Sequence, residues 1–395
     1  MDNKANISSL RYTRVAVSAF FFFQGLCFSN WATRIPDVKT NLGLDDAEWG
    51  TVLLMMPIGQ VSAMGITTPL ITKFGSKSIS LIGFLLFAIT FVTVSLARDQ
   101  YSLMVILVLL GLFANLCNLA VNTQAVNLEK LYEKPIMSSI HGSWSIANVV
   151  GALVGMLFIN IRLSTLQHFV SVASVSLLLI LFFTKFLLPK LIDKKIHEQK
   201  IAKDKIAKKR PEHFLYLLGI IGFCGLAMEA TMVDWGAIYF KSVVEAPENL
   251  YSLGFTAFVI TMAIGRFVSD KVVEKWGERS FFIMCGLIVI VGALLTFVSP
   301  SLITSTLAFM IIGFGIAGIS PVVFSVAARK TMVSAQLALT LMFGLSFSGF
   351  LLIPPFIGYL SYILDLRTAF TLFIVLGICV VTLASVLRIL KKEIR

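Results

Sequence analysis

The sequence has few charged residues for its length. Only 14% of its 395 residues are Asp, Glu, Lys or Arg, whereas soluble domains carry about 25% because their surface must face water. This shortage excludes an ordinary water-soluble protein. The mean hydropathy of +0.89 and the hydrophobic content of 57% indicate instead that much of the surface faces lipid.

Residue clusters that support enzymatic chemistry are also missing. The five cysteines stand singly inside apolar runs, without C-x-x-C spacing or neighbouring ligands, which argues against disulfides and against a metal site. No P-loop or other nucleotide-binding motif is present, so the sequence gives no support for a process driven directly by ATP hydrolysis. We find no arrangement of nucleophile, acid and base either. We therefore predict that the chain is not an enzyme and has no cofactor and no metal.

Long apolar runs are what the sequence does contain. A membrane-crossing helix needs ~20 such residues and satisfies its own backbone hydrogen bonds. The runs predict an all-α polytopic membrane protein with twelve transmembrane helices. The first run is longer than a signal-peptide core and lacks a clear cleavage site, so we expect it to be retained. The predicted spans are 15–33, 47–72, 79–97, 101–124, 138–159, 164–188, 213–240, 250–269, 280–298, 303–327, 334–358 and 367–390.

Basic residues outnumber acidic ones by 33 to 21. If the amino terminus is cytoplasmic, most lysines and arginines fall in segments on the cytoplasmic side, which is the positive-inside pattern. The net charge of +12 therefore indicates topology and not nucleic-acid binding. We expect both termini to lie in the cytoplasm.

One long polar stretch, between Lys185 and Pro211, separates six predicted spans from six others. It predicts an amino-terminal bundle of residues 1–184, a cytoplasmic basic linker of residues 185–212, and a carboxy-terminal bundle of residues 213–395. The lysines and isoleucines of the linker fit either a solvated segment or an amphipathic helix on the anionic leaflet.

The two halves resemble each other at a nearly fixed offset, which argues for duplication into two six-helix repeats. Parallel repeats of this kind are the plan of one large transporter class. The Lys-Phe-Gly-Ser sequence at 73–76 corresponds to the Lys-Trp-Gly-Glu sequence at 275–278. The matched pairs are Gly75 with Gly277, Gly111 with Gly313 and Gly142 with Gly344, all at 202 residues, and Trp31 with Trp235 at 204.

Polar residues within the spans mark candidate functional positions, because such residues are costly in lipid. The fourth and fifth spans each carry three polar or amphipathic residues at i, i+3 and i+7, which places them on one helical stripe. We predict that these stripes line a hydrophilic substrate-binding cavity; interhelical hydrogen bonding is the alternative. The candidate substrate-binding residues of the first half are Gln24, Asn30, Asn115, Asn118, Asn122, His141, Trp144 and Asn148.

The second half offers aromatic residues at equivalent positions. Phe343 and Phe350 stand 202 residues after His141 and Asn148. Amides from one half and aromatic faces from the other suit a polar solute with an apolar face, such as a sugar, and equally suit amphipathic drugs. Taken singly, each phenylalanine also fits ordinary packing.

Two carboxylates lie well inside the seventh span. Glu229 is near its middle and Asp234 near its outer end. A carboxylic acid in apolar surroundings can hold a proton near physiological pH, as a proton-coupled carrier requires. We predict proton coupling at these two residues, with Glu229 the better candidate, and an alternative role for Asp234 as the partner of Arg34 in an outer gate or brace.

A further group of residues suggests gating. Arg266 stands four residues before Asp270, so it can pair with that residue or extend to the cytoplasm. We assign Arg34, Arg266 and Asp270 to gates. Bends that a moving bundle needs are expected at Pro57, Pro321 and the Pro354-Pro355 pair.

Three stretches carry a resemblance to a known family: residues 31–37 (Trp-Ala-Thr-Arg-Ile-Pro-Asp), 137–145 (Met-Ser-Ser-Ile-His-Gly-Ser-Trp-Ser) and 229–235 (Glu-Ala-Thr-Met-Val-Asp-Trp). The chain resembles the major facilitator superfamily over its whole length. Specifically, it is similar to a bacterial branch often labelled YbjJ-like, related to fucose permease-type sugar:proton symporters. That branch tends to have an acid where Asn118 stands, which shifts the expected proton coupling to Glu229.

The family's cytoplasmic loop signature is degraded in the first half. Lys73, Gly75 and Lys77 match it, whereas Thr68 and Thr72 replace its glycine and its acid. The counterpart in the second half, from Gly265 to Arg279, keeps an acid and its cations. The resemblance therefore implies that a charge-based inner gate depends mainly on the second half.

The resemblance implies a secondary active transporter of the bacterial inner membrane that works by alternating access. Its expected partners are a small polar solute, protons and the lipid bilayer, and it is expected to be a monomer. An efflux antiporter for amphipathic compounds is the main alternative within transport. A non-transporting membrane receptor or scaffold is the alternative outside it, and would need neither polar stripes nor a titratable residue within a span.

Overall fold

A computed structural model describes residues 2–132, 136–190, 212–331, 333 and 335–390. Its regular elements are helices throughout this part of the chain, without a strand. Eleven helical segments there are long and apolar enough to cross a membrane. The longest, Glu248–Val298, contains the predicted spans 250–269 and 280–298, which accounts for the difference from the twelve predicted. The all-α polytopic fold is thus confirmed.

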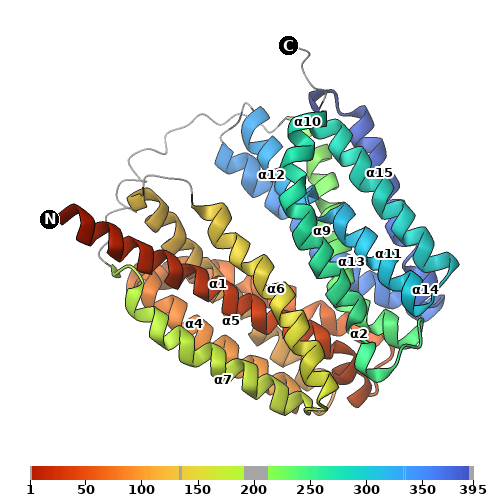
Figure 1. Ribbon diagram of the computed structural model, residues 1–395, viewed down its shortest axis with the longest axis horizontal. Coiled ribbons are helices and arrows are strands. Elements are labelled where there is room, and N and C mark those ends of the chain that lie inside the picture. The colour runs from red at the N-terminus through yellow and green to blue at the C-terminus, as the bar shows by residue number, and fades with distance from the viewer. Residues whose placement is uncertain (1, 133–135, 191–211, 332, 334, 391–395) are drawn as a thin grey trace. The chain divides into compact units, whose positions relative to one another are not determined.

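The chain divides into two compact units. Unit 1 comprises Met1–Leu42 and Met55–Lys205. Figure 1 shows its helices as a bundle of long ribbons, from red through yellow. They are α1 (Asp2–Asn41), α3 (Met55–Phe74), α4 (Ser76–Thr93), α5 (Gln100–Tyr132), α6 (Met137–Asn160) and α7 (Thr165–Phe183), with short 3-10 turns at Val94–Leu96 and Thr184–Phe186.

Unit 2 comprises Gly43–Leu54 and Ile206–Arg395, so the short helix α2 groups with it. The predicted linker lies mostly outside the described residues. The helices of unit 2 are α2 (Asp46–Leu53), α9 (His213–Ser242), α10 (Leu253–Val298), α11 (Leu302–Ile316), α12 (Ile319–Lys330), α13 (Ala335–Ile363), α14 (Leu366–Ala369) and α15 (Leu372–Val386), with 3-10 turns at Glu248–Leu250 and Arg388–Leu390.

Two of the expected proline positions coincide with helix breaks. A proline cannot donate the backbone hydrogen bond to the residue four before it. The helix before Pro57 ends at Leu53, and the helix before Pro321 ends at Ile316. Pro354 and Pro355 lie inside the continuous helix α13, where the carbonyl of Pro354 accepts a hydrogen bond from Trp235 Nε1 at 2.9 Å.

Helix α2 packs closely against α13 within unit 2. A Cβ placed on Gly358 would lie 2.7 Å from the Cα of Gly50, so this contact requires glycine at both positions. Hydroxyl hydrogen bonds flank it: Thr51 Oγ1 lies 2.7 Å from the Tyr359 hydroxyl. The break after Leu53 therefore lets α2 pack on α13.

The matched glycines of the two repeats adopt the same unusual backbone conformation. Gly75 joins α3 to α4 with φ 86° and ψ 150°, and Gly277 bends α10 with φ 79° and ψ 166°. This combination is essentially restricted to glycine. Two residues 202 positions apart thus make the same turn between consecutive spans, as duplication predicts.

Alanine at either turn should destabilise the protein. We expect Gly75→Ala and Gly277→Ala each to cost about 1–3 kcal/mol, because a Cβ is strained at these dihedral angles. Thermal unfolding of the detergent-solubilised protein measures the effect. Gly65→Ala is the matched control, since Gly65 is helical and a Cβ there meets nothing within 4 Å. Equal melting temperatures for all three variants would contradict the argument.

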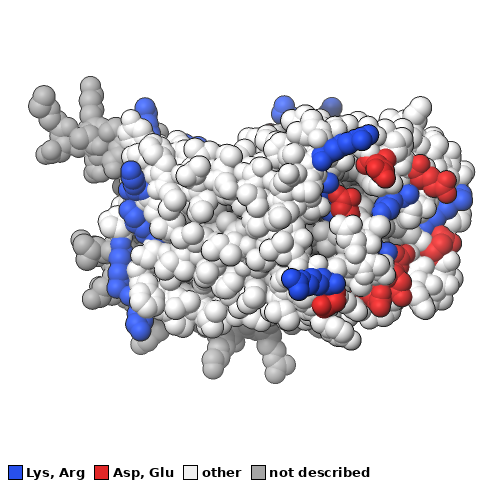
Figure 2. Space-filling view, turned by 90° about the horizontal axis from the view of Figure 1, so that it is seen from below, with Lys and Arg blue, Asp and Glu red and all other residues white. Residues whose placement is uncertain are grey.

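The surface agrees with a lipid environment. Figure 2 shows one face on which a broad band carries no charged side chain, and charged residues lie at its two ends. Large apolar side chains are exposed along the helices; Ile89 is 56% exposed, Ile146 55% and Leu178 69%. In water such exposure would be costly, whereas in a bilayer these are the residues that contact acyl chains.

Candidate transport site

Helix α1 is the buried centre of unit 1, and two predicted binding residues belong to its interior. Gln24 is 3% exposed and its Nε2 donates to the carbonyl of Ala114 in α5 at 2.5 Å. Asn30 is fully buried and its Nδ2 donates to the carbonyl of Leu26 at 2.7 Å. The Gln24 side chain therefore joins α1 to α5, whereas this bond of Asn30 stays within α1.

A buried polar network surrounds Arg34 at the end of α1. Its Nε donates to Nδ1 of His168 in α7 at 2.9 Å, and its Nη1 reaches Asp37 Oδ2 at 2.6 Å. Its Nη2 donates to the carbonyl of Leu163 at 2.6 Å. His168 Nε2 lies 2.6 Å from Asn30 Oδ1. Since Nδ1 accepts from Arg34, the ring proton is on Nε2 and is donated to Asn30.

This network differs from the pairing expected for Arg34. The sequence suggested Asp234 as its partner, whereas the structure gives its guanidinium three partners within unit 1. His168 was not among the predicted site residues. Its signal in the sequence is weak, because it is a single histidine with no motif around it, and its two partners precede it by more than 130 residues.

The three asparagines of the α5 stripe are half-buried. Asn122 Nδ2 donates to both the backbone carbonyl and Oδ1 of Asn118, each at 2.9 Å. Asn115 Nδ2 donates to the carbonyl of Gln60 in α3 at 2.6 Å. Asn115 therefore also contributes to interhelical bonding, whereas Asn118 and Asn122 form a local pair with spare hydrogen-bonding capacity.

The stripe of α6 contacts α1 along part of its surface. The ring of His141 lies 4.7 Å from that of Phe21, centroid to centroid, and a Cβ on Gly25 would lie 3.2 Å from the Trp144 ring. Asn148 is 9% exposed; its backbone carbonyl accepts from Ser29, and its side-chain Oδ1 is buried without a partner. His141 is exposed and Trp144 is half-buried, so lining of a cavity by the α6 stripe stays a prediction.

In unit 2, Glu229 and Arg266 form an ion pair between two spans. Arg266 Nη2 lies 3.1 Å from Glu229 Oε1, with the side chains 30% and 23% exposed. Arg266 also contacts the sulfur of Met262. Spacing along the sequence suggested Asp270 or the cytoplasm for this arginine, and not Glu229. The pair joins α9 to α10 within their membrane-spanning segments.

Asp234 lies one and a half turns further along α9 and is half-exposed. It forms no hydrogen bond or ion pair with the part of the chain that the structure describes. Asp270 is exposed near the end of the first half of α10. The two acids of α9 thus differ: Glu229 has a cationic partner and Asp234 has none among the described residues.

The predicted phenylalanines of α13 belong to a stacked ladder. The rings of Phe343 and Phe347 are 5.5 Å apart at 11°, and those of Phe347 and Phe350 are 5.5 Å apart at 13°. Phe343 is 45% exposed and the other two are half-buried. Phe347, the middle ring of the three, was not among the predicted residues. Its counterpart in the first repeat is Ser145, which is not part of the polar stripe from which the other two were identified.

A second charged cluster lies near the turn at Gly277. Glu278 Oε1 accepts from Arg329 at 3.0 Å and Oε2 from Lys330 at 2.7 Å, and Lys330 also donates to the carbonyl of Ile389 at 2.7 Å. The acid belongs to the stretch of the second-half loop signature, from Gly265 to Arg279, whereas its two cations come from the end of α12.

Comparison with known proteins places this geometry in a family. The model of the Major Facilitator Superfamily matches residues 17–331 and again 218–393. The membrane protein MosC of Rhizobium meliloti is 29% identical over 376 residues, covering 95% of this chain and 90% of MosC. An uncharacterised transporter of this superfamily from Yersinia pestis is 25% identical over 357 residues, covering 90% and 91%.

Solved structures agree in fold. The nucleoside transporter NupG superposes with a TM-score of 0.74 at 16% identity, covering 96% of this chain and all of NupG. A bacterial homologue of the human lysosomal transporter Spinster, in an inward-facing and occupied conformation, gives 0.75 at 14% identity, covering 95% and 96%. At these identities the likeness establishes the fold alone. With the superfamily model matching most of its length, the chain belongs to the Major Facilitator Superfamily.

Proposed function

We propose that this protein is a proton-coupled secondary transporter of the bacterial inner membrane, which moves a small polar solute by alternating access. The observation that carries the proposal is the ion pair between Glu229 and Arg266 inside two spans. Charges within a membrane are expensive and are kept where they serve transport. Protonation of Glu229 neutralises its carboxylate and releases Arg266, so proton binding changes a contact between α9 and α10.

The polar residues of unit 1 supply the solute-binding part of the proposal. Asn118 and Asn122 present amide groups at a half-exposed surface, and Asn148 has a buried side-chain oxygen without a partner. A buried acceptor of this kind is stabilised by a donor such as a solute hydroxyl or a water molecule. We therefore assign these three asparagines to binding of a hydroxyl-rich solute, with a sugar as the first class to test.

Uptake into proteoliposomes tests the function. The purified full-length protein is reconstituted, and uptake of labelled sugars is followed with and without an imposed inward proton gradient. We expect the unaltered protein to accumulate sugar when the gradient is imposed. Glu229→Gln should lose this accumulation, because a glutamine side chain does not bind and release a proton. Asp234→Asn, measured in parallel, reports whether the unpaired acid shares the role.

The matched control is Glu248→Gln, which removes an exposed carboxylate from a loop of the same unit. It should transport normally. If Glu229→Gln and Asp234→Asn both retain full dependence on the gradient, proton coupling through α9 is wrong.

A second candidate function rests on the stacked ladder of Phe343, Phe347 and Phe350. Aromatic faces bind planar or amphipathic cations, so efflux of such compounds is the alternative. The same proteoliposomes separate the two candidates. Proton-driven expulsion of an amphipathic cation without sugar uptake would favour the antiporter, and sugar accumulation that the cation does not inhibit would exclude it.

A further inference from the structure

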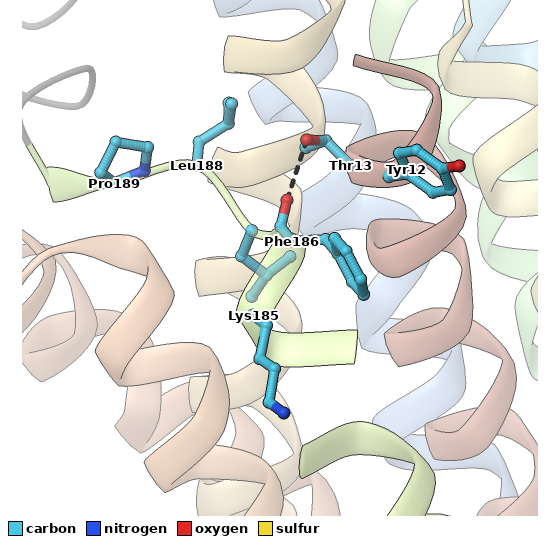
Figure 3. A pocket seen from close by; sticks show the side chains of 7 residues that line it. Tyr12, Thr13, Lys185, Phe186, Leu188 and Pro189 are labelled. Carbon is cyan, nitrogen blue, oxygen red and sulfur yellow. Dashed lines mark hydrogen bonds between the residues drawn. The ribbon is translucent and has the colours of Figure 1, made fainter. Parts of the chain in front are cut away.

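A cavity of about 440 Å³ lies at one end of unit 1, where the chain leaves α7. It is lined by the start of α1 and by the segment that follows α7. Figure 3 shows Tyr12 and Thr13 on one side and Phe186 on the other, with Leu188 and Pro189 beyond. Tyr12 stacks on Phe186 at 5.6 Å and 28°, and Thr13 Oγ1 donates to the carbonyl of Phe186 at 2.8 Å.

The walls of this cavity are fixed by buried hydrogen bonds. Gln124 of α5 donates through Nε2 to Ser76 Oγ at 2.6 Å and to the carbonyl of Leu188 at 3.0 Å, and its Oε1 accepts from the Leu188 amide at 2.8 Å. Gln124 is completely buried. The segment after α7 is therefore held in place by α5 and by the first residue of α4.

Four lysines gather around the same place. Lys190 Nζ donates to the carbonyl of Lys73 at 2.6 Å, and Lys77 Nζ to the carbonyl of Lys185 at 3.3 Å. Lys185 lines the cavity, and its exposed ammonium group has no partner in the part of the chain that the structure describes. These bonds bring the turn at Gly75 and the end of α7 together, so the four positive charges form one cluster.

Acids are missing from the sequence segments that carry these lysines and Tyr12, as far as residue 192. The sequence has no Asp or Glu in residues 3–36, 49–98 or 134–192. Among the described residues on the face drawn in Figure 2, Lys and Arg without Asp or Glu lie at one end of the uncharged band, whereas the other end carries both signs. A group of four lysines of this kind attracts anions.

The cluster lies at the level where spans begin and end. Spans of unit 1 end at Phe74 and Phe186 and another begins at Ser76, each within a few residues of one of these lysines. At this level the anions of highest local concentration are phospholipid headgroups. Tyr12, 60% exposed, has the amphipathic ring that is enriched at the membrane interface.

We propose that this cavity and its four lysines bind the phosphodiester headgroup of an anionic phospholipid. Lys185 supplies a cation at the wall of the cavity, and Lys73, Lys77 and Lys190 supply the surrounding positive potential. The exposed apolar side chains of α7, such as Leu178 and Phe182, lie along the path of the acyl chains. The site is separate from the solute-binding residues and does not depend on the proposed function.

Native mass spectrometry of the full-length protein tests the proposal. Protein in a neutral detergent is mixed with phosphatidylglycerol or phosphatidylcholine, and the retained lipid is counted. We expect selective retention of phosphatidylglycerol, and a roughly tenfold or greater loss of its affinity in Lys77→Gln with Lys185→Gln, because each lysine near anionic lipid contributes appreciably to binding. Inorganic phosphate and glycerol phosphate at the same concentration should not displace the lipid.

The control variant is Lys39→Gln with Arg98→Gln, which removes two positive charges from the same unit at the other ends of α1 and α4. It should retain the lipid as the unaltered protein does. Equal binding of the two lipids, equal losses in the two double variants, or displacement by inorganic phosphate would each overturn the proposal. Thermal unfolding of both double variants confirms that they are folded when lipid is measured.

Discussion

Replacing Arg266 by Met is expected to abolish gradient-driven uptake and to lower the stability of the protein by about 1–3 kcal/mol. In the structure the Glu229 carboxylate lies 3.1 Å from the Arg266 guanidinium. The substitution removes this cation and leaves the carboxylate unpaired inside a span. Full burial would give a larger loss, but both side chains are partly exposed and solvent reduces the effect.

The double variant separates the pair from the individual residues. Glu229→Gln with Arg266→Met removes both charges, so stability should return toward that of the unaltered protein while transport stays lost. The difference between the double variant and the two single variants gives the coupling energy directly. Lys271→Met, on an exposed position of the same helix, is the control and should have little effect. Additive losses would mean that the pair contributes nothing.

Replacing His168 by Leu is the second change with a large expected effect. It leaves Nε of Arg34 and Oδ1 of Asn30 without their partner in a site where His168 itself is fully buried. Each unsatisfied buried group costs about 1–3 kcal/mol, so we expect a loss of about 2–5 kcal/mol and poor accumulation in the membrane.

His168→Gln provides the comparison that identifies the hydrogen bonds as the cause. A glutamine can accept from Arg34 through its oxygen and donate to Asn30 through its nitrogen, and should recover part of the loss. His213→Gln, at an exposed position, controls for removal of a histidine. Thermal unfolding measures all three variants. A Leu variant as stable as the Gln variant would show that the ring contributes by packing alone.

The sequence was sufficient for the features that depend on the chain locally. Apolar runs predict spans because each span must satisfy its own backbone, and Pro57 and Pro321 mark breaks because proline lacks a donor. The repeated Gly75 and Gly277 indicated duplication before their shared conformation was seen. These inferences need no knowledge of which helices are neighbours.

The features that depend on neighbouring helices could not be predicted in the same way. Periodicity places His141, Trp144 and Asn148 on one stripe but does not say that α1 contacts it. Spacing along one helix suggested Asp270 for Arg266, whereas the partner is Glu229, 37 residues earlier on another helix. The partner suggested for Arg34 was Asp234, whereas its Nε donates to His168, which lies 134 residues later in the chain. Partner choice is a property of packing, which one sequence does not specify.

The central claim is that the amide stripe of α5 and Glu229 of α9 reach water inside the membrane. In a variant with the native cysteines replaced, single cysteines at positions 118, 122 and 229 are treated in membranes with a small water-soluble maleimide. Positions 89 and 146, which carry exposed apolar side chains, serve as lipid-facing controls. Thiols react as thiolates, which form in water and not in lipid.

The account predicts fast modification at Asn118→Cys, Asn122→Cys and Glu229→Cys and slow modification at Ile89→Cys and Ile146→Cys. Substrate, once identified, should slow the reaction at the two asparagine positions. If all five positions react at the same slow rate, the polar residues are sealed from water and the transport mechanism proposed here is contradicted.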